Sequence, residues 1–97
     1  MQYDDFIKFT KESKPSDKLS GVHLAIWYVV KDNWDKAHNI VQGINSETAS
    51  WIHAYLHRVG GDIDNAHYWY NHARKEPYAE SLNSELDDII KLLFSQH

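Results

Sequence analysis

The chain has 97 residues, which is enough for one domain but leaves too little chain to bury a second core. Apolar residues make up 42% of the sequence and aromatic residues 13%, so it predicts a folded protein. A net charge of -4 without a basic run disfavours nucleic acid as a partner, and the lack of cysteine excludes disulfides and thiolate metal sites.

The sequence also bears on location. No stretch approaches the roughly 18 apolar residues that a membrane span requires, so no membrane partner is expected. Asp4 and Asp5 stand where a secretory signal would carry positive charge. Together with the absence of cysteine, these features predict a cytoplasmic protein.

Every clear hydrophobic period in the chain is helical, which predicts a single all-α domain over residues 1–97 with about six helices. The first helix is expected at about residues 3–13 and ends before Pro15, because proline disfavours helix in the residue before it. The second begins near Ser16 or Asp17, since both are competent N-caps. Its apolar stripe consists of Leu19, Val22, Ile26, Trp27 and Val30.

Two further helices follow in the middle of the chain. Asn33 can cap a third helix over residues 34–42, with Gly43 near its C-cap. Ser46 can cap a fourth helix that ends at Gly60. The residues predicted to face the core are Ala37, Ile40, Val41, Trp51, Ile52, Tyr55, Leu56 and Val59.

The last two helices are separated by a proline. Asp62 can cap the fifth helix, which is expected to run to about Lys75 and to be closed by Pro77. The C-terminal helix is predicted at about residues 79–96. The residues predicted to face the core are Ile63, Ala66, Trp69, Tyr70, Ala73, Leu82, Leu86, Ile89, Ile90, Leu93 and Phe94.

An internal similarity links the central helices. Residues 34–38 align with residues 63–67 at an offset of 29 residues. This predicts two helix-turn-helix repeats, one over about residues 17–43 and the other over about residues 46–75, between flanking N- and C-terminal helices. In the second repeat, Gly60 and Gly61 would form the tight turn, with Gly60 in the left-handed C-cap position.

The second hairpin resembles a tetratricopeptide repeat at Ala54, Gly60, Gly61, Ala66, Tyr70, Ala73 and Pro77. In that family small residues lie at helix crossings and a proline ends the unit. The resemblance covers about residues 24–77 and departs from the family in its spacing, which is 29 residues here and about 34 in the family. Residues 54–58, 61–62 and 65–70 are also similar to parts of short bacterial all-helical proteins, and that similarity implies no activity.

Two histidines are candidate metal ligands. His53 and His57 are four residues apart and therefore share one helical face, a spacing that allows two imidazoles to bind one ion. A third ligand would come from His67 across the turn, or from Glu47. The sequence alone favours a packing role at the edge of the apolar stripe, and it leaves metal binding and acid-base or ligand contact as alternatives.

No catalytic motif is present, because the serines lack a nucleophile-elbow frame and the glycine pair lacks a phosphate-binding Lys. The sequence therefore favours a non-catalytic interaction module, without a cofactor, that binds a protein or peptide partner or a second copy of itself. The alternative is a metal-binding or small-ligand protein. The residues expected to contact a partner or ligand are Tyr55, His57, Tyr68, His72 and Arg74.

Overall fold

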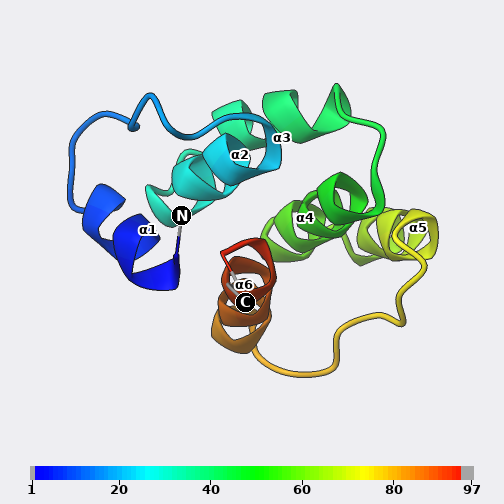
Figure 1. The fold of residues 1–97 in the computed structure, drawn as a ribbon. Coiled ribbons are helices and arrows are strands. Elements are labelled where there is room, and N and C mark those ends of the chain that lie inside the picture. Colours follow the sequence, from blue (N-terminus) through cyan, green and yellow to red (C-terminus); the bar gives the residue numbers. More distant parts are fainter. Residues whose placement is uncertain (1, 95–97) are drawn as a thin grey trace.

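The computed structural model describes residues 2–94, and within that range the chain forms six α-helices and no strand (Figure 1). The predicted all-α fold of about six helices is confirmed. None of these helices combines the length and the apolar character needed to cross a membrane. The helices are α1 (Tyr3–Phe9), α2 (Gly21–Val30), α3 (Trp34–Gln42), α4 (Glu47–Val59), α5 (Ile63–His72) and α6 (Leu82–Leu93).

Helix α4 is the centre of the molecule. It packs against α5 in one hairpin and against α3, α2 and α6 on its other sides (Figure 1). All six residues from Trp51 to Leu56 are buried, because neighbouring helices cover nearly every face of this helix. A side chain in the middle of α4 therefore meets another helix whichever way it points.

The first and last helices close the core around α2. Phe6 of α1 and Phe94 after α6 are both buried and stack with ring centroids 4.3 Å apart. The indole nitrogen of Trp27 donates a hydrogen bond of 2.9 Å to the carbonyl oxygen of Phe9, and the Tyr3 hydroxyl donates one of 3.1 Å to Asp87. Residues from opposite ends of the sequence thus share one apolar cluster.

The capping residues predicted for the central helices are confirmed. The side chains of Asn33, Ser46 and Asp62 each accept a hydrogen bond from the backbone nitrogen three residues later. In α6 the same role belongs to Ser81, so this helix begins at Leu82 and not near residue 79. The predicted end of that helix, near residue 96, lies outside the described residues.

The first connection differs from the prediction. Helix α1 ends at Phe9 rather than near residue 13, and α2 begins at Gly21 rather than near Ser16. Ser16 does act locally, because its hydroxyl accepts a hydrogen bond of 3.1 Å from the backbone nitrogen of Lys18. That contact closes one turn only, and Ser20 is the N-cap of the helix itself.

Helices α2, α4 and α5 end in the same backbone turn. In α4 the nitrogen of Asp62 donates to the carbonyl oxygen of His57 at 2.9 Å, which is the long hydrogen bond of a Schellman motif. The left-handed residue in that motif is Gly61, with φ 81°, whereas Gly60 has φ -77°. The predicted left-handed position at Gly60 is therefore wrong by one residue, because the motif places it after the C-cap.

The equivalent left-handed residues of the other two turns carry side chains. Asp32 ends α2 with φ 61°, and Arg74 ends α5 with φ 59°. Helix α5 consequently ends at His72 and does not reach Lys75. The turns after α2 and α4 lie at the same offset of 29 residues that relates the two hairpins in sequence.

Substitution of the two turn glycines should give opposite results. Gly61→Ala should lower the free energy of unfolding by about 1 kcal/mol, because a Cβ atom is strained at positive φ although nothing lies within 4 Å of it. Gly60→Ala should be neutral or stabilising, since its φ is negative and its Cβ would meet only ordinary contacts. Urea unfolding of both variants measures the difference, and an equal cost at both positions would contradict the assigned turn.

Four residues predicted to face the core are exposed instead. Each is the first or last residue of its helix, beyond the point where the helices cross, so a correct helical face still reaches solvent there. They are Val30 and Val59 at the ends of α2 and α4, and Ile63 and Leu82 at the starts of α5 and α6.

Candidate functional site

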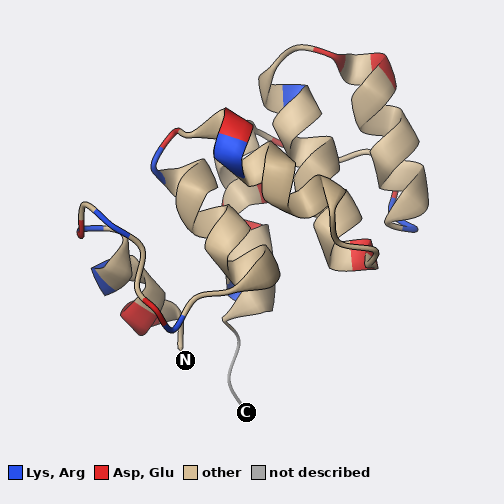
Figure 2. Cartoon of the chain, turned by 90° about the horizontal axis from the view of Figure 1, so that it is seen from above, with Lys and Arg blue, Asp and Glu red and all other residues tan. Residues whose placement is uncertain are grey.

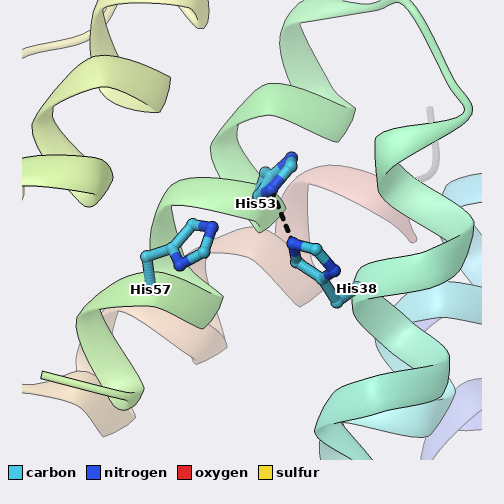
Figure 3. Close-up of side chains that lie close together, drawn as sticks. All are labelled: His38, His53 and His57. Carbon is cyan, nitrogen blue, oxygen red and sulfur yellow. Dashed lines mark hydrogen bonds between the residues drawn. The ribbon is translucent and has the colours of Figure 1, made fainter. Parts of the chain in front are cut away.

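Three imidazoles converge between α3 and α4 (Figure 3). Helix α4 supplies His53 and His57, one turn apart on the same face, and α3 supplies His38 from the facing helix. Each ring offers a nitrogen, and these nitrogens all lie within 4.8 Å of one another. We call these three residues the histidine cluster.

Trp34 positions the α3 member of the cluster. Its indole nitrogen donates a hydrogen bond of 2.7 Å to the carbonyl oxygen of Leu56, which ties the start of α3 to α4. His38 lies one turn further along α3 and stacks on the Trp34 ring, with centroids 4.7 Å apart and planes 10° apart. The tryptophan thereby holds the imidazole against α4.

His53 lies in the interior, with only 4% of its surface exposed. The predicted position at the edge of the apolar stripe is therefore corrected. Its ring stacks on Trp69 of α5 with a centroid distance of 3.9 Å, while His38 of α3 meets the edge of the ring, with the two planes 90° apart. The burial follows from the central place of α4, because a residue at the edge of one helix face meets the next helix.

The histidine cluster contains a hydrogen bond and an unpaired nitrogen. The Nε2 atoms of His53 and His38 are 3.0 Å apart, so one ring donates a hydrogen bond to the other (Figure 3). The Nδ1 atom of His53 is buried and has no hydrogen-bond partner among the described residues. A buried polar atom without a partner costs about 1 to 3 kcal/mol, and its retention in a folded protein calls for a reason.

Burial keeps the two α4 histidines of the cluster uncharged at neutral pH. Loss of solvent, followed by the proximity of His38 and His57, lowers the pKa of His53 to about 4. Burial and the nearby His38 also lower the pKa of His57. Both imidazoles are therefore neutral and can accept a proton or bind a cation through a ring lone pair.

The third histidine is not the one expected. His67 is exposed on α5 and does not belong to the cluster, and Glu47 forms an exposed ion pair of 3.5 Å with Arg74. His38 occupies the position equivalent to His67 in the sequence alignment, but α3 packs against both α2 and α4, whereas α5 packs mainly against α4. Helix α5 lies at the edge of the molecule, so the same position faces solvent there (Figure 1).

The five residues expected to contact a partner do not form one surface. Tyr55 is buried in the core, and His57 belongs to the histidine cluster. Tyr68 and His72 lie together on the exposed side of α5, with ring centroids 4.5 Å apart. Arg74 is exposed in the turn that ends α5. Only the α5 pair and Arg74 are accessible to a large partner.

A second polar group was not anticipated from the sequence. Glu85 of α6 is fully buried, and its Oε2 atom accepts hydrogen bonds from the indole of Trp51 at 2.9 Å and from the Tyr70 hydroxyl. Its Oε1 atom pairs with Arg58 Nη1 at 2.9 Å. The signal was available, because Glu85 is three residues after Leu82 and four before Ile89, within the apolar stripe.

The Glu85 group ties three helices together and has no unpaired polar atom. Arg58 also donates to the backbone oxygen of Glu80 in the segment before α6. Burial, together with the hydrogen bond to Glu85 and its charge, raises the pKa of Tyr70, so the tyrosine stays protonated as a donor. Because every partner is satisfied within the protein, this group stabilises the fold and offers nothing to a ligand.

The fold and the cluster together define an all-helical protein in which three histidines converge around the buried His53. No family model, curated protein or solved structure matches this chain.

Proposed function

We propose that the chain binds one divalent transition-metal ion through His38, His53 and His57. The observation that carries this proposal is the convergence of three ring nitrogens within 4.8 Å, on two packed helices and beside a buried nitrogen without a partner. This proposal is the metal-binding alternative derived from the sequence, except that His38 and not His67 supplies the third ligand.

The chemistry of the ligands selects the class of metal. Neutral imidazoles suit Zn²⁺, Cu²⁺ and Ni²⁺, whereas Mg²⁺ and Ca²⁺ prefer carboxylate and carbonyl oxygens, which this cluster lacks. Nitrogens bound to one tetrahedral zinc ion lie about 3.4 Å apart, because each Zn–N bond is about 2.0 to 2.1 Å. The 3.0 Å separation between His38 and His53 is close to that spacing. Three protein ligands leave a fourth position for water or another molecule.

The outer contacts of the cluster also support the proposal. Metal-bound histidines are commonly oriented by a hydrogen bond from their second nitrogen. Here two tryptophans provide orientation by stacking, since Trp34 lies on His38 and Trp69 lies on His53. Their apolar faces also cover His38 and His53, and lower polarity around a cation strengthens its interaction with its ligands.

Metal binding should stabilise the folded protein. With protein that carries no histidine tag, Zn²⁺ at a hundredfold excess over its Kd should add about 2.7 kcal/mol, since binding to the native state alone stabilises by RT ln(1 + [L]/Kd). His38→Gln should abolish this gain. The thermal midpoint with and without metal, together with the metal content at saturation, measures both effects.

The matched control is His67→Gln, which removes a histidine from the exposed side of α5 and should retain the full gain. Cobalt provides an independent measurement, because a site with nitrogen ligands gives Co²⁺ a visible absorption spectrum that His38→Gln should eliminate. Absence of saturable stabilisation by Zn²⁺, Ni²⁺ and Cu²⁺ would contradict the proposal, as would equal loss in both variants.

A second candidate function is an interaction module for a protein or peptide partner, or for a second copy of the chain, acting in the cytoplasm. It is favoured by the exposed aromatic pair on α5, since Tyr68 is 55% exposed and His72 lies against it. Trp69 connects this pair to His53, so a partner on α5 would lie next to the histidine cluster. The resemblance of the second hairpin to a tetratricopeptide repeat stays a prediction.

A further inference from the structure

A cleft of about 440 Å³ opens on the side of the molecule away from α5. It lies between the segment that joins α1 to α2, the end of α2 and the start of α3. Its volume falls in the range of about 300 to 1,000 Å³ that is typical of ligand sites. The lining residues are Ser13, Lys14, Pro15, Trp27, Tyr28, Lys31, Asn33 and Lys36, and we call this the basic cleft.

Three lysines and two aromatic rings dominate the basic cleft. The Lys31 ammonium lies 5.4 Å from the centroid of the buried Trp27 ring and donates a hydrogen bond of 2.9 Å to the carbonyl oxygen of Thr10. The Lys36 ammonium lies 5.3 Å from the centroid of Tyr28. The aromatic faces hold these two ammonium groups beside the cleft.

The cleft lysines have no carboxylate partner among the described residues. Within residues 2–94, the basic members of the ion pairs are Arg58, Arg74 and Lys91. No carboxylate oxygen in that range lies within 4.0 Å of a cleft lysine nitrogen. Asp32 and Asp35 are adjacent in sequence to Lys31 and Lys36 but do not line the cleft. Over the ribbon as a whole, acidic and basic residues are mixed along the helices and loops (Figure 2).

This gathering of like charge is unusual in a chain whose net charge is -4. Ammonium groups that share a cleft repel one another, and an anionic occupant removes that repulsion while gaining attraction from each of them. The walls of the cleft contribute apolar surface from Pro15, Trp27 and Tyr28. A suitable occupant therefore carries negative charges on side chains whose aliphatic parts can pack against these walls.

We propose that the basic cleft binds an acidic segment of a partner polypeptide, rich in Asp and Glu. Lysines act as point charges that tolerate carboxylates in many orientations, while planar, bidentate recognition of phosphate favours arginine, which does not line the cleft. A peptide also supplies the aliphatic stems and a backbone that the hydroxyl of Ser13 and the amide of Asn33 can meet. This site is separate from the histidine cluster and does not depend on metal.

A labelled hexaglutamate peptide tests the proposal. Titrated with the full chain in the presence of a metal chelator, it should bind saturably and weaken severalfold when the salt concentration rises from about 20 to 200 mM, because the attraction is screened. Hexaglutamine should not bind. Lys14→Gln combined with Lys36→Gln should raise the Kd at least about tenfold. Fluorescence anisotropy of the labelled peptide measures each constant.

The matched control is Lys11→Gln combined with Lys18→Gln, which removes the same charge from the α1–α2 segment outside the cleft and should leave the Kd within about twofold. The Lys14 and Lys36 double variant leaves Lys31 unchanged, because the Lys31 ammonium binds the carbonyl oxygen of Thr10 in the α1–α2 segment. Equal weakening in both double variants would overturn the proposal. Tighter binding of inorganic phosphate or a short oligothymidylate, lost on substitution of Lys14 and Lys36, would also overturn it.

Discussion

Glu85→Gln is expected to lower the free energy of unfolding by about 3 to 5 kcal/mol, the largest single effect predicted for this chain. The carboxylate offers two acceptor oxygens, and these accept hydrogen bonds from Trp51, Tyr70 and Arg58. An amide of the same shape offers one oxygen, so its nitrogen would face a donor. The Arg58 guanidinium would also lose the charge that balances it in a partly buried place.

Urea unfolding at neutral pH measures this loss, with Glu80→Gln as the matched control. Glu80 is exposed and contributes only its backbone oxygen to Arg58, so removal of its side-chain charge should shift stability by less than about 0.5 kcal/mol. Replacing Glu85 and Arg58 together with Leu and Met should recover much of the loss, because no unpaired charge is left behind. Equal effects of Glu85→Gln and Glu80→Gln would contradict the assigned pairing.

Acidification should destabilise the metal-free protein through His53. The pKa of His53 is about 4 in the folded state and near its ordinary value of 6.5 when the chain unfolds. At a pH between these values the unfolded chain binds one more proton than the folded chain does. The free energy of unfolding is therefore unaffected above about pH 7 and falls as the pH drops from about 6.5 to about 4. The total loss is about 3 kcal/mol, since one pKa unit corresponds to about 1.4 kcal/mol.

The lowered pKa of His57 acts in the same direction and steepens the decline. His53→Gln should flatten the dependence of unfolding free energy on pH over this interval, even though it removes the stacking on Trp69. His67→Gln should keep the slope of the parent protein, because that ring is exposed. A parent protein with no loss of stability between pH 7 and pH 5 would refute the assigned burial of His53.

Local features of this protein were set by the sequence alone. The caps at Asn33, Ser46 and Asp62 could be predicted because a capping side chain contacts a backbone nitrogen only three residues away. The all-helical fold followed from the apolar period, since the hydrophobic faces recur every three or four residues over most of the chain. Errors of several residues occurred where a competing local turn was available, as at Ser16.

The candidate site, in contrast, was decided by tertiary structure. The spacing of His53 and His57 places them on one face of a helix, but it does not specify which helix covers that face. Helix α3 covers it and supplies His38, while His67, which has the same place in the sequence repeat, faces solvent on α5. The role of Glu85 likewise follows only from the tertiary structure, which places Arg58, Trp51 and Tyr70 around its carboxylate.

The physical reason lies in the range of the forces involved. Periodicity and capping depend on neighbours within about four residues, so each helix carries that information in its own sequence. The pairing of Phe6 with Phe94, or of His38 with His53, depends on how the helices within residues 2–94 share one core. Hydrophobic burial is not directional, so it determined which face of each helix turned inward but not which residues met there.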